Sequence, residues 1–98
     1  MAKELFVTDD LENLSEELVF EQILLLQEEQ NEDLPKTDIG IQDVAAIALN
    51  NMPPKYICSF IDKVSPREEL VEDLRDLRKY ARRQILKAVK KVSNNPHD

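Results

Sequence analysis

The sequence predicts a mainly α-helical fold: a small single domain of three helices, with one short strand that pairs across a dimer. Its 98 residues are 42% hydrophobic and 34% charged, a balance that allows a small core. Apolar residues recur at three- and four-residue spacing in three stretches, and an aromatic and β-branched run lies between the second and the third. We therefore treat residues 1–98 as one domain with flexible ends at about residues 1–8 and 94–98.

The first helix has two candidate starting points. Thr8, Asp9 and Asp10 are capping residues ahead of the apolar series, whereas Ser15–Glu17 offers a fresh start after a break near residue 14. The apolar positions of this helix are Leu11, Leu14, Leu18, Val19, Phe20, Ile23, Leu24, Leu25 and Leu26.

A turn-rich connection is expected from about Gln30 to Asp38, because Pro35 cannot sit in a helix interior. A second helix should follow over about Ile39–Asn51, with Asp38 as its cap, and Pro53–Pro54 should end it. Three small residues on this helix allow another helix to approach closely: Ala45, Ala46 and Ala48.

Lys55–Ile61 is expected to form a strand, because it is rich in aromatic and β-branched residues. Cys58 lies inside this run, so we expect a buried packing residue with no catalytic, disulfide or metal role. An apolar strand among helices leaves unpaired backbone groups and needs a partner. Glu4–Val7 could supply one, but pairing with the same strand of a second copy also extends the core, and this predicts a homodimer.

The last helix carries the clearest local signal. Ser65 is placed as an N-cap, Pro66 occupies the first helical position, and Glu68 the third. The amphipathic stripe behind them runs for about 28 residues, or roughly 42 Å at 1.5 Å per residue. Its members are Leu70, Leu74, Leu77, Ala81, Ile85, Ala88 and Val92.

The net charge of −7 is unevenly distributed along the chain. Residues 1–34 hold eleven acids and one lysine, a net of −10, whereas residues 35–98 hold nine acids and twelve bases, a net of +3. The acidic part should repel phosphate backbones, which disfavours nucleic-acid binding. No apolar run approaches the length of a membrane span, so we expect a cytoplasmic protein with no membrane insertion.

The composition argues against an enzyme. The chain has one Cys, one Gly and one His, and that histidine, His97, lies next to the C-terminus, so no serine or cysteine catalytic set can be assembled around it. We expect no cofactor and no metal. The basic stretch that contains Arg75 and Arg78, with Tyr80 beside it, has two interpretations: a solvated helix end or an anion site.

One segment resembles a known family. Asp43–Ile57 is similar to the signature D-V-x-A-x-A-L-N-x-L-P-P-x-Y-V of the late-competence-development ComFB family, with Met52 in place of the leucine and Ile57 in place of the valine. The likeness covers fifteen contiguous residues, and the order of the expected elements around them agrees over most of the chain.

The resemblance implies one of two branches. One branch has cysteines just before the signature that look like zinc ligands, and residues 34–41 of this chain contain none. The cyanobacterial branch lacks them too, and its E-x-L-V-x-E-Q run is similar to Glu16–Gln22 here. Members of that branch are described as dimeric receptors for cyclic dinucleotides. The resemblance therefore implies a non-enzymatic homodimeric receptor for cyclic diguanylate or cyclic diadenylate that signals to a partner protein. The alternative is a protein-interaction module without a small ligand.

Chemistry alone selects the candidate contacts to such a ligand. Lys55 offers a point charge for phosphate, Tyr56 a stacking face, and Arg67 a two-pronged donor near the start of the long helix. A weaker candidate ends the second helix, and two arginines of the long helix offer another location. The candidate ligand-binding residues are Lys55, Tyr56, Arg67, Asn50, Arg75 and Arg78.

Overall fold

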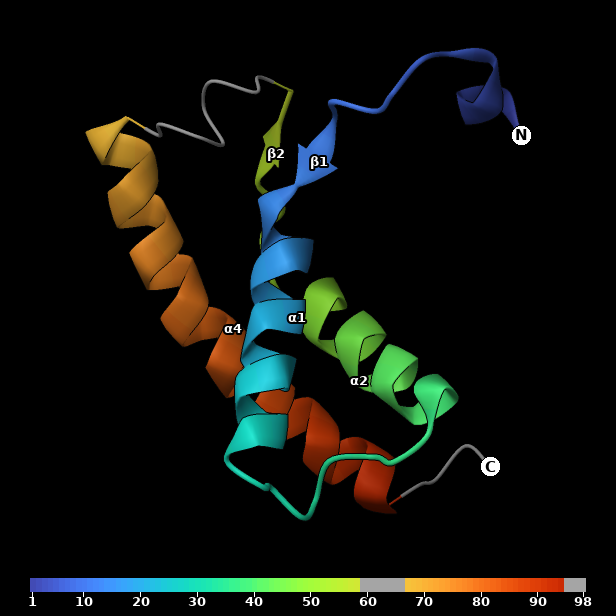
Figure 1. The fold of residues 1–98 in the computed structure, drawn as a ribbon, viewed down its shortest axis with the longest axis vertical. Coiled ribbons are helices and arrows are strands. Elements are labelled where there is room, and N and C mark those ends of the chain that lie inside the picture. Colours follow the sequence, from blue (N-terminus) through green and yellow to red (C-terminus); the bar gives the residue numbers. More distant parts are fainter. Residues whose placement is uncertain (59–66, 95–98) are drawn as a thin grey trace.

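The computed structural model describes residues 1–58 and 67–94, and within them helices dominate (Figure 1). The mainly helical class is confirmed, and the strands of residues 1–58 and 67–94 amount to one short antiparallel pair. In chain order the described elements are η1 (Ala2–Leu5, a 3-10 helix), β1 (Glu12–Asn13), α1 (Leu14–Glu28), α2 (Asp38–Asn50), β2 (Tyr56–Ile57) and α4 (Glu68–Asn94).

The strand that was expected over Lys55–Ile61 is two residues long in the described part of the chain, and residues 59–61 lie outside it. Its partner is β1 of the same chain, with Glu12 opposite Ile57 and Asn13 opposite Tyr56. The alternative partner, Glu4–Val7, was wrong, because β1 takes that place and Glu4 and Leu5 belong to the 3-10 helix η1. Pairing across a dimer stays a prediction.

The start of α1 is fixed by contacts that are distant in sequence. Asn13 is the N-cap, and its Oδ1 accepts hydrogen bonds from the backbone N–H of Ser15 (3.1 Å) and of Lys55 (2.9 Å). The buried Ser15 hydroxyl donates to the carbonyl oxygen of Pro53 at 2.7 Å. The break near residue 14 is therefore confirmed, and capping of this helix by Thr8–Asp10 was wrong.

Replacing Asn13 by alanine should lower the free energy of unfolding by about 1–2 kcal/mol, because one oxygen both caps α1 and holds the segment that enters β2. Urea unfolding followed by circular dichroism measures this. Asn13→Asp keeps an acceptor at the same place and should retain most of the stability. Equal losses in the two variants would contradict the role of the acceptor.

The connection between α1 and α2 also follows from local chemistry. Gln30 adopts a left-handed conformation (φ 58°) just after α1, which lets the backbone turn back against the last turn of the helix. The cap of α2 is Thr37, whose Oγ1 accepts from the Gly40 N–H at 3.0 Å. The expected cap, Asp38, is instead the first helical residue, where its carboxylate still faces the positive end of the helix dipole.

The core lies where α1, α2 and α4 meet. Ile85 of α4, Val19 of α1 and Val44 of α2 are fully buried at its centre. Two of the three small residues expected to allow a close helix approach, Ala45 and Ala48, are buried, whereas Ala46 is exposed. The other buried core members are Ile23, Leu26, Leu34, Met52, Ala81, Ala88 and Val89.

The long helix α4 spans 27 residues, close to the expected length. The capping signal at Ser65 and Pro66 lies outside the described residues. The half of α4 that begins at Ala81 packs into the core, whereas residues 68–80 extend beside β2, away from α2 (Figure 1). None of the described helices combines the length and the apolar character needed to cross a membrane.

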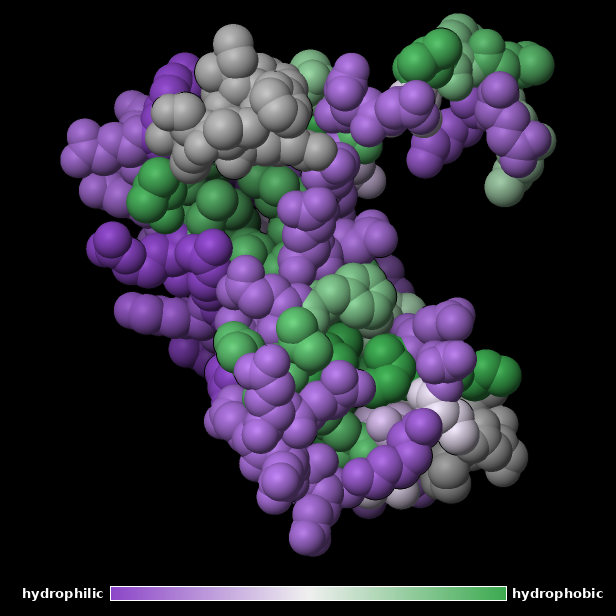
Figure 2. Space-filling view, in the orientation of Figure 1, coloured by the Kyte–Doolittle hydropathy of each residue, from purple (hydrophilic) through white to green (hydrophobic). Residues whose placement is uncertain are grey.

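The N-terminal arm, residues 1–11, extends away from the helices (Figure 1). Its apolar side chains face solvent: Leu5 is 82% exposed, Phe6 71% and Val7 92%. Figure 2 shows this apolar surface apart from the main body. These three apolar side chains are therefore not covered by any other described part of the chain.

Candidate functional site

Two cavities lie next to each other between residues 68–80 of α4 and the segment that leads from the Pro53–Pro54 turn into β2. The larger one measures about 550 Å³ and the smaller one about 380 Å³, both within the range of small-molecule sites. Lys55 and Asp73 line both cavities, so they form the shared wall. Figure 2 shows hydrophobic surface between α4 and the strands on this side of the molecule.

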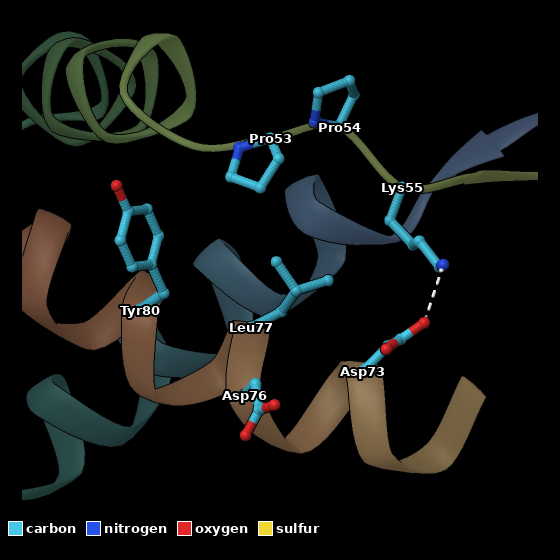
Figure 3. A pocket seen from close by; sticks show the side chains of 7 residues that line it. All are labelled: Pro53, Pro54, Lys55, Asp73, Asp76, Leu77 and Tyr80. Carbon is cyan, nitrogen blue, oxygen red and sulfur yellow. Dashed lines mark hydrogen bonds and ion pairs between the residues drawn. The ribbon is translucent and has the colours of Figure 1, made fainter. Parts of the chain in front are cut away.

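Lys55 and Asp73 form an ion pair across this wall. The Lys55 Nζ lies 3.0 Å from an Asp73 carboxylate oxygen (Figure 3). This contact connects α4 with the segment that precedes β2. The two side chains are 35% and 54% exposed, so water screens the pair and its contribution to stability is small. The ion pair therefore holds the Lys55 ammonium beside Asp73 only weakly, so the ammonium can move to another anion.

The larger cavity has an aromatic and apolar lining. Tyr80 and Leu77 rise from α4 toward the chain at Pro53 and Pro54, while the carboxylate of Asp76 turns away from the prolines (Figure 3). Tyr80 and the two prolines thus offer an aromatic and apolar surface to a flat ring placed in this cavity. This cavity therefore suits a planar group such as a nucleobase.

The smaller cavity brings together three of the residues that sequence reasoning selected. Lys55, Tyr56 and Arg67 all line it, with Tyr56 at the end of the segment and Arg67 immediately before α4. Two cations thus face the same space as the carboxylates of Glu69 and Asp73. Because Arg67 lies at the positive end of the α4 dipole, an anion would be held most strongly on that side of the cavity.

Comparison with known proteins decides the family. The family model described as late competence development protein ComFB matches residues 12–96, which span β1, β2, the three α-helices and every residue of the two cavities except Leu11. The chain belongs to the ComFB family. It has no significant match among curated proteins or among solved structures.

In this ComFB family member, Cys58 is exposed and lines the smaller cavity, so the expectation of a buried packing residue was wrong. The reason is the alternation of the extended chain: Tyr56 is exposed, Ile57 is half-buried, and Cys58 falls on the same outward side as Tyr56. Among the described residues, no three His, Cys, Asp or Glu side chains are grouped to hold a metal ion.

The other three candidate residues of the ComFB chain lie outside both cavities. Asn50 is the exposed last residue of α2, where it ends the helix. Arg75 is exposed on α4, and Arg78 donates from Nε to the Glu21 carboxylate at 3.0 Å, which ties α4 to α1. The structure therefore gathers Lys55, Tyr56 and Arg67 and separates the rest.

Sequence reasoning missed part of the lining. Asp73 lies 18 positions from Lys55, and no local pattern connects the two residues. Leu77 belongs to the amphipathic stripe, and this pattern indicates a residue that faces the core, whereas Leu77 also lines the larger cavity. Tyr80 was noticed beside the basic residues, but only the angle between α4 and the rest of the molecule turns it toward Pro53 (Figure 3).

Proposed function

We propose that this ComFB family member is a non-enzymatic receptor that binds a cyclic purine dinucleotide as a homodimer and signals to a partner protein. The observation that carries the proposal is the smaller cavity, where Lys55, Tyr56 and Arg67 meet next to a second cavity walled by Tyr80. The similarity of Glu16–Gln22 to the cyanobacterial branch of the family supports the same ligand class.

The chemistry of the ligand fits this arrangement. A cyclic dinucleotide has two phosphates and two purine rings, so it needs cations and flat surfaces close together. The Lys55 ammonium has three N–H donors, of which the contact with Asp73 uses one, and the others are free to reach a phosphate. Tyr56, 61% exposed, offers a ring for stacking beside these cations. Tyr80 offers a second ring in the adjacent cavity.

Calorimetric titration with cyclic diguanylate and with cyclic diadenylate tests the proposal. We expect saturable binding heat with at least one of the two cyclic dinucleotides. The corresponding mononucleotide should give none. Cys58 gives an independent readout, because it is the single cysteine of the chain and lines the smaller cavity. Bound ligand should slow its reaction with a maleimide. No heat and no protection on folded, nucleotide-free protein would reject the receptor function.

The Lys55–Asp73 pair yields a prediction about affinity. Asp73→Asn should strengthen cyclic dinucleotide binding several-fold, because a phosphate no longer competes with a carboxylate for the Lys55 ammonium. Calorimetry of the variant beside Glu72→Gln provides a matched control, since Glu72 is exposed on α4 and lines neither cavity. Weaker binding by Asp73→Asn alone would show instead that the carboxylate contacts the ligand.

The second candidate function is a protein-interaction module without a small ligand. The exposed apolar side chains of the N-terminal arm, Leu5, Phe6 and Val7, favour it, because contiguous exposed apolar surface often marks a protein contact. The same arm is available to a second copy, in line with the proposed homodimer. Light scattering that gives a mass of 11.4 kDa at tens of micromolar would contradict the dimer.

A further inference from the structure

From Lys79 to Lys91, α4 has a basic surface that the cavities and the core do not use. Of its bases, Arg82 is committed to α1, donating from Nη1 to Gln22 at 3.1 Å and from Nη2 to Glu29 at 2.7 Å. Five other cations have no ion-pair partner among the described residues. We name them the α4 cationic face: Lys79, Arg83, Lys87, Lys90 and Lys91.

The spacing of this face is regular. Lys79, Arg83, Lys87 and Lys91 follow one another at four-residue intervals, which places them in one row roughly 18 Å long. No acid occurs anywhere in residues 77–94. Like charges four residues apart repel each other, so the row weakens the helix that carries it. A partner of opposite charge would relieve this repulsion.

The helix dipole does not account for the row. Favourable interaction with the negative end of a helix is limited to about its last turn, and Lys91 is the only base of α4 there. Lys79 and Arg83 lie more than two turns before the end of α4 at Asn94. Their exposure without a described partner is therefore not explained by the ordinary chemistry of helix ends.

An apolar side chain lies beside these cations. Leu86 is 40% exposed, and helical geometry places it three residues after Arg83 and four before Lys90, on adjoining positions of the surface. Leu86 therefore adds one apolar contact to the cationic face, which a partner that carries an apolar side chain next to its acids could cover. Nucleic acid, which presents phosphates, would gain little from it.

Electrostatics also favours a compact partner. The net charge of residues 1–34 is −10, and α1, which belongs to them, packs against the same helix α4. A long polyanion that extended beyond the row would meet the carboxylates of α1, including Glu21 and Glu29. A short acidic segment can stay on the cationic face.

We propose that the α4 cationic face, with Leu86 at its side, docks an acidic and partly apolar segment of a partner protein. The proposal deepens the proposed function, because it supplies the surface through which a receptor would reach its partner. It rests on that function only for its biological role, and the contact itself does not involve either cavity.

The test uses a short fluorescein-labelled peptide rich in glutamate and leucine, measured by anisotropy at low salt on the full chain without any nucleotide. Arg83→Glu should weaken binding about tenfold or more, and Leu86→Ser several-fold. Lys36→Glu, an equal charge reversal on the exposed α1–α2 connection, should leave the affinity within about twofold. Arg83→Glu should keep the fold, since it turns the repulsion with Lys79 and Lys87 into attraction.

Three results would overturn the proposal. One is equal binding of a peptide with glutamine in place of glutamate. Another is an equal loss of peptide affinity in Arg83→Glu and in Lys36→Glu, since this would show that only the net charge of the protein matters. The third is tighter binding of a short single-stranded DNA than of the peptide. Because no nucleotide is present, these results stand whether or not the receptor function holds.

Discussion

Ile85→Ala should lower the free energy of unfolding by about 2–5 kcal/mol, the usual cost of removing a large aliphatic side chain from a packed core. Ile85 has no exposed surface and belongs to the cluster in which α1, α2 and α4 meet. The lost side chain would leave a cavity against Val19 and Val44, which are fully buried as well. Urea unfolding, followed by circular dichroism at several protein concentrations, measures the change.

The adjacent residue provides the control. Leu86 is 40% exposed, so Leu86→Ala should change the stability by no more than about 0.5 kcal/mol. Both substitutions are made in the middle of the same helix, and both introduce alanine, so differences in helix propensity are small. Similar losses at the two positions would mean that α4 is not oriented with Ile85 toward the core.

Periodicity was sufficient to predict the helices and much of their buried faces. The stripe on the last helix correctly placed Ala81, Ile85 and Ala88 in the core, because a long helix with few competing apolar residues has one possible buried face. The first helix was harder. Phe20 and Leu24 are as apolar as its core residues, yet they are 42% and 55% exposed.

Caps and strand pairing depend on contacts that a local pattern cannot contain. Thr8 and Asn13 are both capping residues, and the choice between them follows from the Lys55 N–H, 42 positions away, which donates to Asn13. The same contact aligns β1 with β2 and thereby gives the strand its partner within the chain. The error at Cys58 has the same origin, since the pairing with β1 determines which side of the extended chain faces solvent, and Cys58 lies on the exposed side with Tyr56.

The candidate site could be predicted only in part for a similar reason. Lys55 and Tyr56 are neighbours in sequence, and Arg67 directly precedes the long helix, so chemistry alone could group them. The lining from Asp73 and Tyr80 depends on the angle at which α4 crosses the other helices. Arg78 looked available in the sequence, but the acidic α1 lies close enough for Glu21 to bind it.

Arg67→Ala should weaken cyclic dinucleotide binding by about 1.5–3 kcal/mol, which corresponds to roughly ten- to more than a hundredfold in affinity. Arg67 lines the smaller cavity at the positive end of α4, where its guanidinium can donate two parallel hydrogen bonds to a phosphate or to a guanine edge. It is exposed and has no ion-pair partner among the described residues, so its removal should leave the fold intact.

Arg75→Ala is the matched comparison for this prediction. It removes the same kind of side chain eight residues farther along, at an exposed position of α4 that lines neither cavity. Calorimetry should therefore show an affinity close to that of the unchanged protein, and circular dichroism should show equal helicity for both variants. Loss of binding in Arg75→Ala together with full binding in Arg67→Ala would move the ligand from the cavities to the outer surface of α4. Equal, modest losses in both variants would indicate that the two arginines act only through net charge, because a site built around Arg67 requires the position of its guanidinium and not merely its charge.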